Sequence, residues 1–121
     1  MKNVDVIREN LLELHRVLVE EERRAYERTH GKTTAGQFLD VLVNHEDLAW
    51  LKPLTALIVA LDDDEVDHAS WAERARTMLR PDAEGGPFQR RYDELVQRSP
   101  ELVVAHGAAV RALVREDALV N

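Results

Sequence analysis

The chain has 121 residues, of which 45% are hydrophobic and 32% charged, a composition typical of one soluble globular domain spanning residues 1–121. Its formal net charge of −7 argues against binding to nucleic acid or to an anionic membrane, because both partners need a basic surface. The absence of cysteine excludes disulfides, thiolate metal sites and cysteine nucleophiles. The longest mainly apolar run, 54–61, is far shorter than the roughly 20 residues of a membrane span. Without a secretory signal pattern at the amino terminus, we expect a cytoplasmic protein.

The first predicted element is a long helix from Val4 to about His30. It rests on apolar residues that recur at three- and four-residue steps, namely Val4, Ile7, Leu11, Leu14 and Leu18. Beyond Val19 the pattern fades into charged residues, so we expect the second half of the helix to project partly into solvent. Gly31 is a plausible stop for this helix.

Two shorter helices are expected next. Thr33 or Thr34 can cap a second helix that ends near residue 44. A third segment begins near Asp47 and carries Pro53 early, where the missing N–H has no helical partner. Because this segment is apolar on nearly every side, we expect it to be the most buried element. The residues predicted for the centre of the core are Trp50, Leu54, Leu57, Ile58 and Leu61.

The remaining chain predicts three more helices. One runs from about Glu65 to Leu79, since Pro81 bars its continuation, and a glycine-rich loop follows. The next ends at Ser99-Pro100, where Ser99 caps the last helix. The inner face of that last helix is predicted to carry Leu102, Val103, His106, Ala109, Val110, Leu113 and Val114. No segment alternates like a strand, so the predicted fold class is all-α, a bundle of about six helices, four of them long.

An acidic stretch, Asp62-Asp63-Asp64-Glu65-Val66-Asp67-His68, raises the question of metal binding. It fails as a calcium loop of the EF-hand type, because Val66 and Asp67 stand where an oxygen ligand and a glycine are required. Aspartates are also typical of helix starts, where Asp64 could act as the cap. We interpret the stretch as a helix boundary and predict no metal and no cofactor.

A ligand-binding alternative stays open for the same stretch. Asp64, Glu65 and His68 include part of the Glu-x-x-His spacing of di-iron bundles, although the chain has no second copy of that motif. A metal- or small-ligand-binding bundle would use these three residues together with His15 or His106.

The histidines and serines offer little for catalysis. His106 lies on the apolar face of the last helix and is interpreted as a core histidine bonded to a neighbouring carbonyl or carboxylate, while His15 flanks the core stripe of the first helix. Ser70 and Ser99 are the only serines, and no phosphate-binding glycine loop is present. We predict no catalytic residues and no enzymatic activity.

Two blocks, LHRVLVEEERRAYERTHG (14–31) and AWLKPLTALIVALDD (49–63), resemble a group of small, uncharacterised helical bacterial proteins. The resemblance implies an all-α fold. Members of that group are sometimes described as RNA polymerase sigma subunits, but this chain is too short and too acidic to carry basic promoter-reading helices. A transcription-associated partner that contacts polymerase rather than DNA is therefore the weaker alternative.

The preferred function is a non-catalytic protein that acts through protein–protein contacts, as a homodimer or a small regulatory partner. The stripe on the first helix continues into a charged extension, an arrangement that suits pairing with another helix. The predicted interface residues are Val4, Ile7, Leu11 and His15. The alternative is that this stripe is used within the core of the chain itself. Neither nucleic acid nor membrane is expected as a partner.

Overall fold

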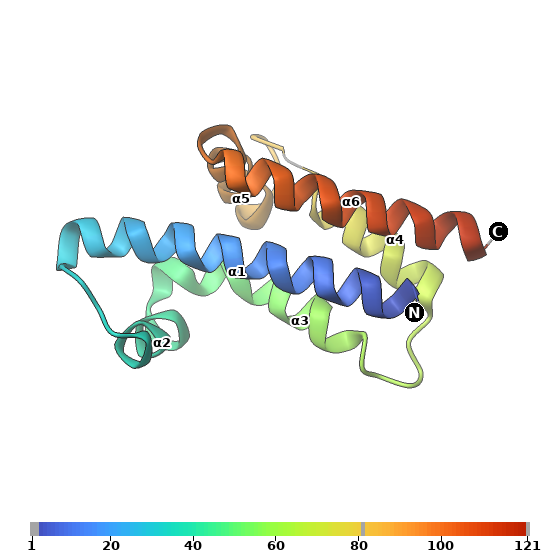
Figure 1. The fold of residues 1–121 in the computed structure, drawn as a ribbon, viewed down its shortest axis with the longest axis horizontal. Helices are drawn as coiled ribbons and strands as arrows, with labels where there is room; N and C mark the ends of the chain where they lie inside the picture. Colours follow the sequence, from blue (N-terminus) through green and yellow to red (C-terminus); the bar gives the residue numbers. More distant parts are fainter. Residues whose placement is uncertain (1–2, 81, 121) are drawn as a thin grey trace.

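The computed structural model describes residues 3–80 and 82–120, and the side chains of 4–80 and 82–114 (Figure 1). The described residues form six α-helices and one 3₁₀ helix and contain no strand, which confirms the predicted all-α bundle. In chain order these are α1 (Asn3–His30), α2 (Ala35–Asn44), the 3₁₀ helix η1 (Glu46–Leu51), α3 (Lys52–Ala60), α4 (His68–Met78), α5 (Pro87–Arg98) and α6 (Pro100–Val120). No helix within the described ranges is both long enough and apolar enough to cross a membrane.

The two longest helices, α1 and α6, lie side by side and antiparallel, and they share the most extensive contact in the bundle (Figure 1). α3 packs along another side of α1 and also runs antiparallel to it. α4 and α5 pack against α6, whereas α2 is held mainly through η1. The core therefore lies between α1, α6 and the shorter helices that cover them.

The stripe predicted on α1 is part of this core. Four of its members, Ile7, Leu11, Leu14 and Leu18, are at most 2% exposed. They meet apolar side chains from every other α-helix except α2, and a fully buried leucine or isoleucine stabilises the fold by about 1.5–3 kcal/mol. The largest side chains in the core are Trp71 and Tyr92.

Local signals at the end of α1 act as predicted. Gly31 adopts a φ of 84°, in the left-handed region that favours glycine, and its N–H donates to the Glu27 carbonyl at 3.0 Å. Of the two candidate caps for α2, Thr34 is the one used. Its side chain accepts from the N–H of Gln37, while the Gln37 side chain accepts from the Thr34 N–H, which completes a capping box.

The second half of α1 projects partly into solvent, as predicted, since residues 28–30 are exposed, but polar contacts also tie it to other helices. The Glu22 carboxylate is buried and accepts a 2.6 Å hydrogen bond from Arg91 of α5. Ser99 at the start of α6 donates to Glu21 at 2.9 Å. Polar contacts between distant segments hold this half of the helix, and hydrophobic periodicity cannot reveal such contacts.

The prediction that the third helix would be the most buried element is wrong. Leu54, Leu57 and Leu61 are buried as expected, but Trp50 and Ile58 are only half-buried, and Val59 is 62% exposed. α3 lies on the outside of α1 and has a packing neighbour on one face only. Its other face keeps apolar residues in contact with solvent.

The acidic stretch forms the corner between α3 and α4, as predicted, but the helix boundary differs. α4 begins at His68 rather than near Glu65, and the cap is Asp67, whose carboxylate accepts from the Ala69 N–H at 3.2 Å. Asp64 is not the cap. The chain needs residues 61–67 to reverse its direction, so the helix can start only after them.

The inner face of α6 is partly as predicted. Leu102, Ala109 and Leu113 are buried and His106 is half-buried. Val103 and Val114, however, are 49% and 53% exposed, and their predicted places are taken by Ala105 and Ala112. The small side chains face the core because α1 packs closely along the length of α6 and leaves little room there.

Candidate functional site

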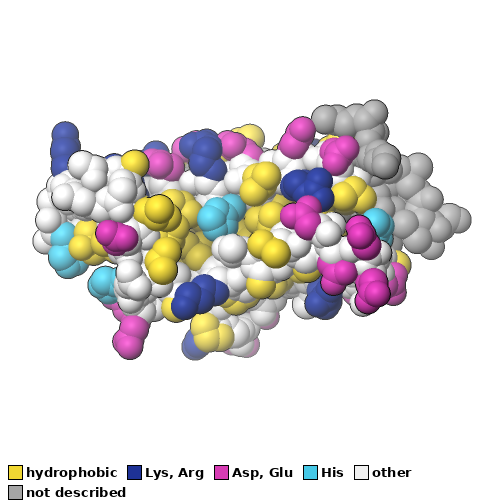
Figure 2. Space-filling view, turned by 90° about the horizontal axis from the view of Figure 1, so that it is seen from below, with side chains coloured by type: hydrophobic (Ala, Val, Ile, Leu, Met, Phe, Trp, Pro, Cys, Tyr) yellow, Lys and Arg dark blue, Asp and Glu magenta, His cyan; other side chains and the backbone are white. Residues whose placement is uncertain are grey.

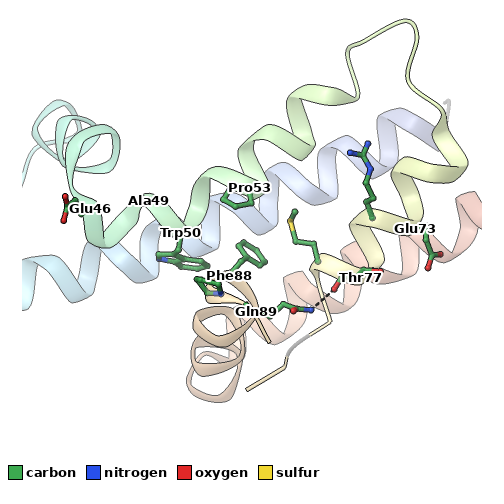
Figure 3. Close-up of a pocket in the computed structure, with 12 residues that line it drawn as sticks. Glu46, Ala49, Trp50, Pro53, Glu73, Thr77, Phe88 and Gln89 are labelled. Carbon is green, nitrogen blue, oxygen red and sulfur yellow. Dashed lines mark hydrogen bonds between the residues drawn. The ribbon is translucent and has the colours of Figure 1, made fainter. Parts of the chain in front are cut away.

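An apolar groove of about 890 Å³ lies where η1 and the start of α3 face the end of α4 and the start of α5 (Figure 3). Its apolar lining comes from Ala49, Trp50, Pro53, Met78, Pro87 and Phe88, and its polar lining from Glu46, Glu73, Arg74, Thr77, Gly86 and Gln89. Figure 3 shows Glu46 at one end and Glu73 at the other, with the aromatic rings between them. Such a lining, apolar with few polar groups, is typical of a binding site.

A series of rings leads from the groove into the core. The ring centroids of Trp50 and Phe88 are 5.4 Å apart, those of Phe88 and Tyr92 are 5.5 Å apart, and those of Tyr92 and His106 are 5.5 Å apart. The series ends in a 2.6 Å hydrogen bond between the Tyr92 hydroxyl and His106 Nδ1. His106 is therefore bonded to a neighbour, but its partner is a tyrosine hydroxyl rather than the predicted carbonyl or carboxylate, and the ring is only half-buried. Through Tyr92 it supports the Phe88 ring of the groove from behind.

Burial keeps both members of this hydrogen bond neutral. It raises the pKa of the Tyr92 phenol and lowers the pKa of the His106 imidazole. Two neutral partners share one hydrogen between the hydroxyl oxygen and Nδ1, and the tautomer of the imidazole decides which of the two atoms donates it.

The two tryptophans differ in how they are held. Trp71 Nε1 donates to the Leu57 carbonyl at 2.9 Å in the core. Trp50 Nε1 is buried and has no hydrogen-bond partner among the described residues, so packing alone holds that ring at the groove. A ring held only by packing can shift when an apolar group enters the groove.

Gln89 closes the groove beside α5. Its side-chain amide donates to the carbonyls of Thr77 at 3.0 Å and Arg80 at 3.3 Å, which ties the end of α4 to the start of α5. Gly85 is required here, because a Cβ at that position would lie 2.9 Å from the Cβ of Gln89. The wall of the groove is thus fixed by backbone contacts.

A second hollow of about 420 Å³ lies between the second half of α1, η1 and α5. Tyr26 stacks on His30 with centroids 4.1 Å apart, and the buried Glu22 pairs with Arg91 across it. Because its charged groups already satisfy one another, we interpret this pocket as a junction that joins three elements.

The residues predicted as an interface on the first helix are used within the chain. Ile7 and Leu11 are 2% and 0% exposed in the core, while Val4 and His15 are half-buried. His15 Nε2 lies 3.2 Å from Thr55 Oγ1 and joins α1 to α3, and burial lowers the pKa of this histidine. Burial therefore supports the alternative that the stripe belongs to the core.

The candidate metal ligands are not brought together. Asp64, Glu65 and His68 are exposed in the corner between α3 and α4. His15 contacts Thr55 and His106 contacts Tyr92, so neither histidine joins them. Within the described part of the chain, no group of three or more His, Asp or Glu side chains is placed to hold a metal ion.

Sequence reasoning missed the groove because it assigned Trp50 to the centre of the core. Pro53 and Pro87 stand in the first turns of α3 and α5 at the edge of the groove, but a proline at a helix start does not by itself indicate a ligand site. Comparisons with protein-family models, with curated proteins and with solved structures give no match to this chain.

Proposed function

We propose that this chain is a non-catalytic protein that binds another protein, and that the groove between α3, α4 and α5 receives an amphipathic helix of that partner. The observation that carries the proposal is the lining of the groove. Trp50, Phe88 and Met78 present large apolar surfaces in one hollow of about 890 Å³. Aromatic residues and methionine are enriched at the centres of protein interfaces, and methionine adapts to the shape of a partner.

The geometry favours a helix over a strand. The groove is bounded by helices, and no described strand offers an edge for a partner strand. An amphipathic helix can insert side chains at i, i+3, i+4 and i+7 into such a groove. The fixed floor, supported by the Tyr92–His106 hydrogen bond, reduces the ordering required on binding.

Charge indicates the flanks of the partner helix. Glu46 and Glu73 lie at opposite ends of the groove, and the whole chain has a net charge of −7. Charges around an apolar centre steer encounter and select partners. Because Glu73 already pairs with Arg76 at 2.6 Å and Arg74 lines the same part of the groove, we expect an apolar helical segment with a lysine or arginine that meets Glu46.

The test is titration with a synthetic amphipathic helix that carries leucines at i, i+3, i+4 and i+7 and a lysine at one end, monitored by tryptophan emission. Binding should change the emission of wild-type protein and leave that of Trp50→Phe, which retains the core Trp71, nearly unchanged. Met78→Glu should weaken binding at least about tenfold, because it places a charge in the apolar floor. Val104→Glu, at a valine 71% exposed on α6 and outside the groove lining, is the matched control and should bind normally.

A peptide that does not bind, or that binds Met78→Glu as tightly as wild type, would show that the groove is not a helix-binding site. The same variants then identify the partner in a cell lysate. The partner is the protein retained by wild type and by Val104→Glu but lost with Met78→Glu.

A further inference from the structure

A self-complementary stripe runs along the solvent face of α3, directly opposite the core face of that helix. We call it the α3 outer stripe, and it consists of Lys52, Thr55, Ala56, Val59 and Asp63. These residues follow one another at three- and four-residue steps, and all five are exposed. Asp63 lies three residues beyond the end of α3, after a turn in which the N–H groups of Asp62 and Asp63 donate to the Val59 and Ala60 carbonyls.

The stripe is apolar in the middle and oppositely charged at its ends. Val59 is 62% exposed, and Ala56 offers no steric barrier to close approach. Lys52 stands at one end, and no described acidic side chain pairs with it. Asp63, followed by Asp64 and Glu65, stands at the other end.

Neighbouring helices extend the apolar centre. Arg8 bonds to Asp62 at 2.8 Å and His15 to Thr55 at 3.2 Å, which aligns α1 antiparallel to α3. This register sets Leu12, which is 50% exposed, alongside residue 58. Figure 2 shows hydrophobic side chains gathered over the middle of this face, with acidic side chains at the end where the loop after α3 lies.

We propose that a second copy of this chain covers this face, with the two α3 helices antiparallel about a two-fold axis. In a two-fold interface, residue i of one copy meets residue j of the other, and j meets i. A stripe that is basic at one end and acidic at the other matches its own inverted image, so Lys52 of each copy meets Asp63 of the other. The Val59 and Ala56 side chains then pack around the axis, and antiparallel helices also oppose their dipoles favourably.

The α3 outer stripe shares no residue with the lining of the groove, although Ala56 lies one helical turn from Pro53 at the groove edge. The proposed dimer contact therefore lies on the outer face of α3 and not on α1, whose apolar stripe is buried in the core. A different partner would need an acidic group opposite Lys52 and a basic group opposite Asp63. A second copy, turned about the two-fold axis, has both groups in those places.

Sedimentation equilibrium on the full chain tests the proposal. Wild type should show a particle of twice 13.8 kDa at micromolar concentration, and raising the salt concentration should weaken it. Lys52→Glu and Asp63→Lys should each raise the dissociation constant at least about tenfold, because each sets like charges against one another twice per dimer. The double variant Lys52→Glu/Asp63→Lys restores opposite charges and should recover most of the affinity.

Val59→Glu supplies a second test at the centre of the interface. It should produce monomers, whereas Val104→Glu, the same change at an exposed valine on α6, should leave the dimer intact. A wild-type protein that stays at 13.8 kDa, a double variant no tighter than the singles, or equal effects of the two valine changes would overturn the proposal. All stripe variants should still bind the helical peptide in the groove, which separates this outcome from a failure of the proposed function.

Discussion

Substitutions on opposite faces of α3 measure how one-sided its burial is. Leu57 is 5% exposed in the core, and Val59, two residues along, is 62% exposed on the outer face. Leu57→Ala removes most of a buried side chain and leaves a cavity, which should cost about 3 kcal/mol. The backbone carbonyl of Leu57, which accepts from Trp71, is retained in the variant, so the loss reflects packing alone. A loss of that size is a large share of the roughly 5–15 kcal/mol that stabilises a domain.

Val59→Ala should change the free energy of unfolding by less than about 0.5 kcal/mol, because little surface is lost and alanine favours the helix. The assay is urea denaturation followed by far-ultraviolet circular dichroism, at sub-micromolar concentration so that the chain is monomeric. Thermal melting should agree, with Leu57→Ala lowering the Tm by about 10 °C. Equal losses at the two positions would mean that α3 is buried on both faces, and the one-sided packing inferred here would be refuted.

Three further predictions follow from single contacts. Glu22→Ala leaves the partly buried Arg91 guanidinium without its main partner and should cost about 2 kcal/mol in urea melts. The exposed Glu94→Ala should cost less than about 0.5 kcal/mol, and equal costs would contradict the structural role of the buried pair. Gly31→Ala should destabilise the fold by about 1 kcal/mol because the φ of Gly31 is 84°. Gly36→Ala, in a helix with open space around it, should stabilise the fold by up to about 1 kcal/mol. Calorimetry that ranks the two variants in the other order would refute the left-handed cap assigned to Gly31. Burial lowers the pKa of His106 in the folded state below the unfolded value of 6.5, so the unfolded chain binds more protons. The contribution of His106 to the free energy of unfolding is therefore fully present above pH 6.5 and is lost as the pH falls. His106→Gln should flatten this part of the curve of unfolding free energy against pH, and an unchanged curve would show that another group is responsible.

Much of the fold was predictable because its determinants are local. Periodicity identified the α1 stripe, and Gly31, Thr34, Ser99 and Pro100 mark helix ends at the predicted places. Each of these signals acts within one helical turn, through backbone hydrogen bonds or a restricted φ. The boundary at Asp67 was predicted wrongly because it depends on how far the chain must travel, and the pair of Glu22 and Arg91 was not predicted because its members are distant in sequence.

The candidate site was much less predictable than the fold. Trp50, Met78 and Phe88 are apolar residues on helices, and nothing in their spacing distinguishes a groove from a core. These side chains line a groove only because α3 and α4 are separated from each other where α5 begins. The same limit applies to the α3 outer stripe, whose Val59 has the appearance of a core residue in the sequence.

The sequence by itself determined the class of this protein: acidic, cysteine-free and all-helical, with its helix ends in nearly the right places. Composition and periodicity suffice for that, because helix formation and burial of an apolar stripe are decided within each segment. Only the tertiary structure decided which apolar face meets which neighbour. It assigned the α1 stripe to the core, left one side of α3 open to solvent and assembled the groove from three helices. Those outcomes depend on the packing of segments far apart in the chain, and a one-dimensional pattern does not specify that packing.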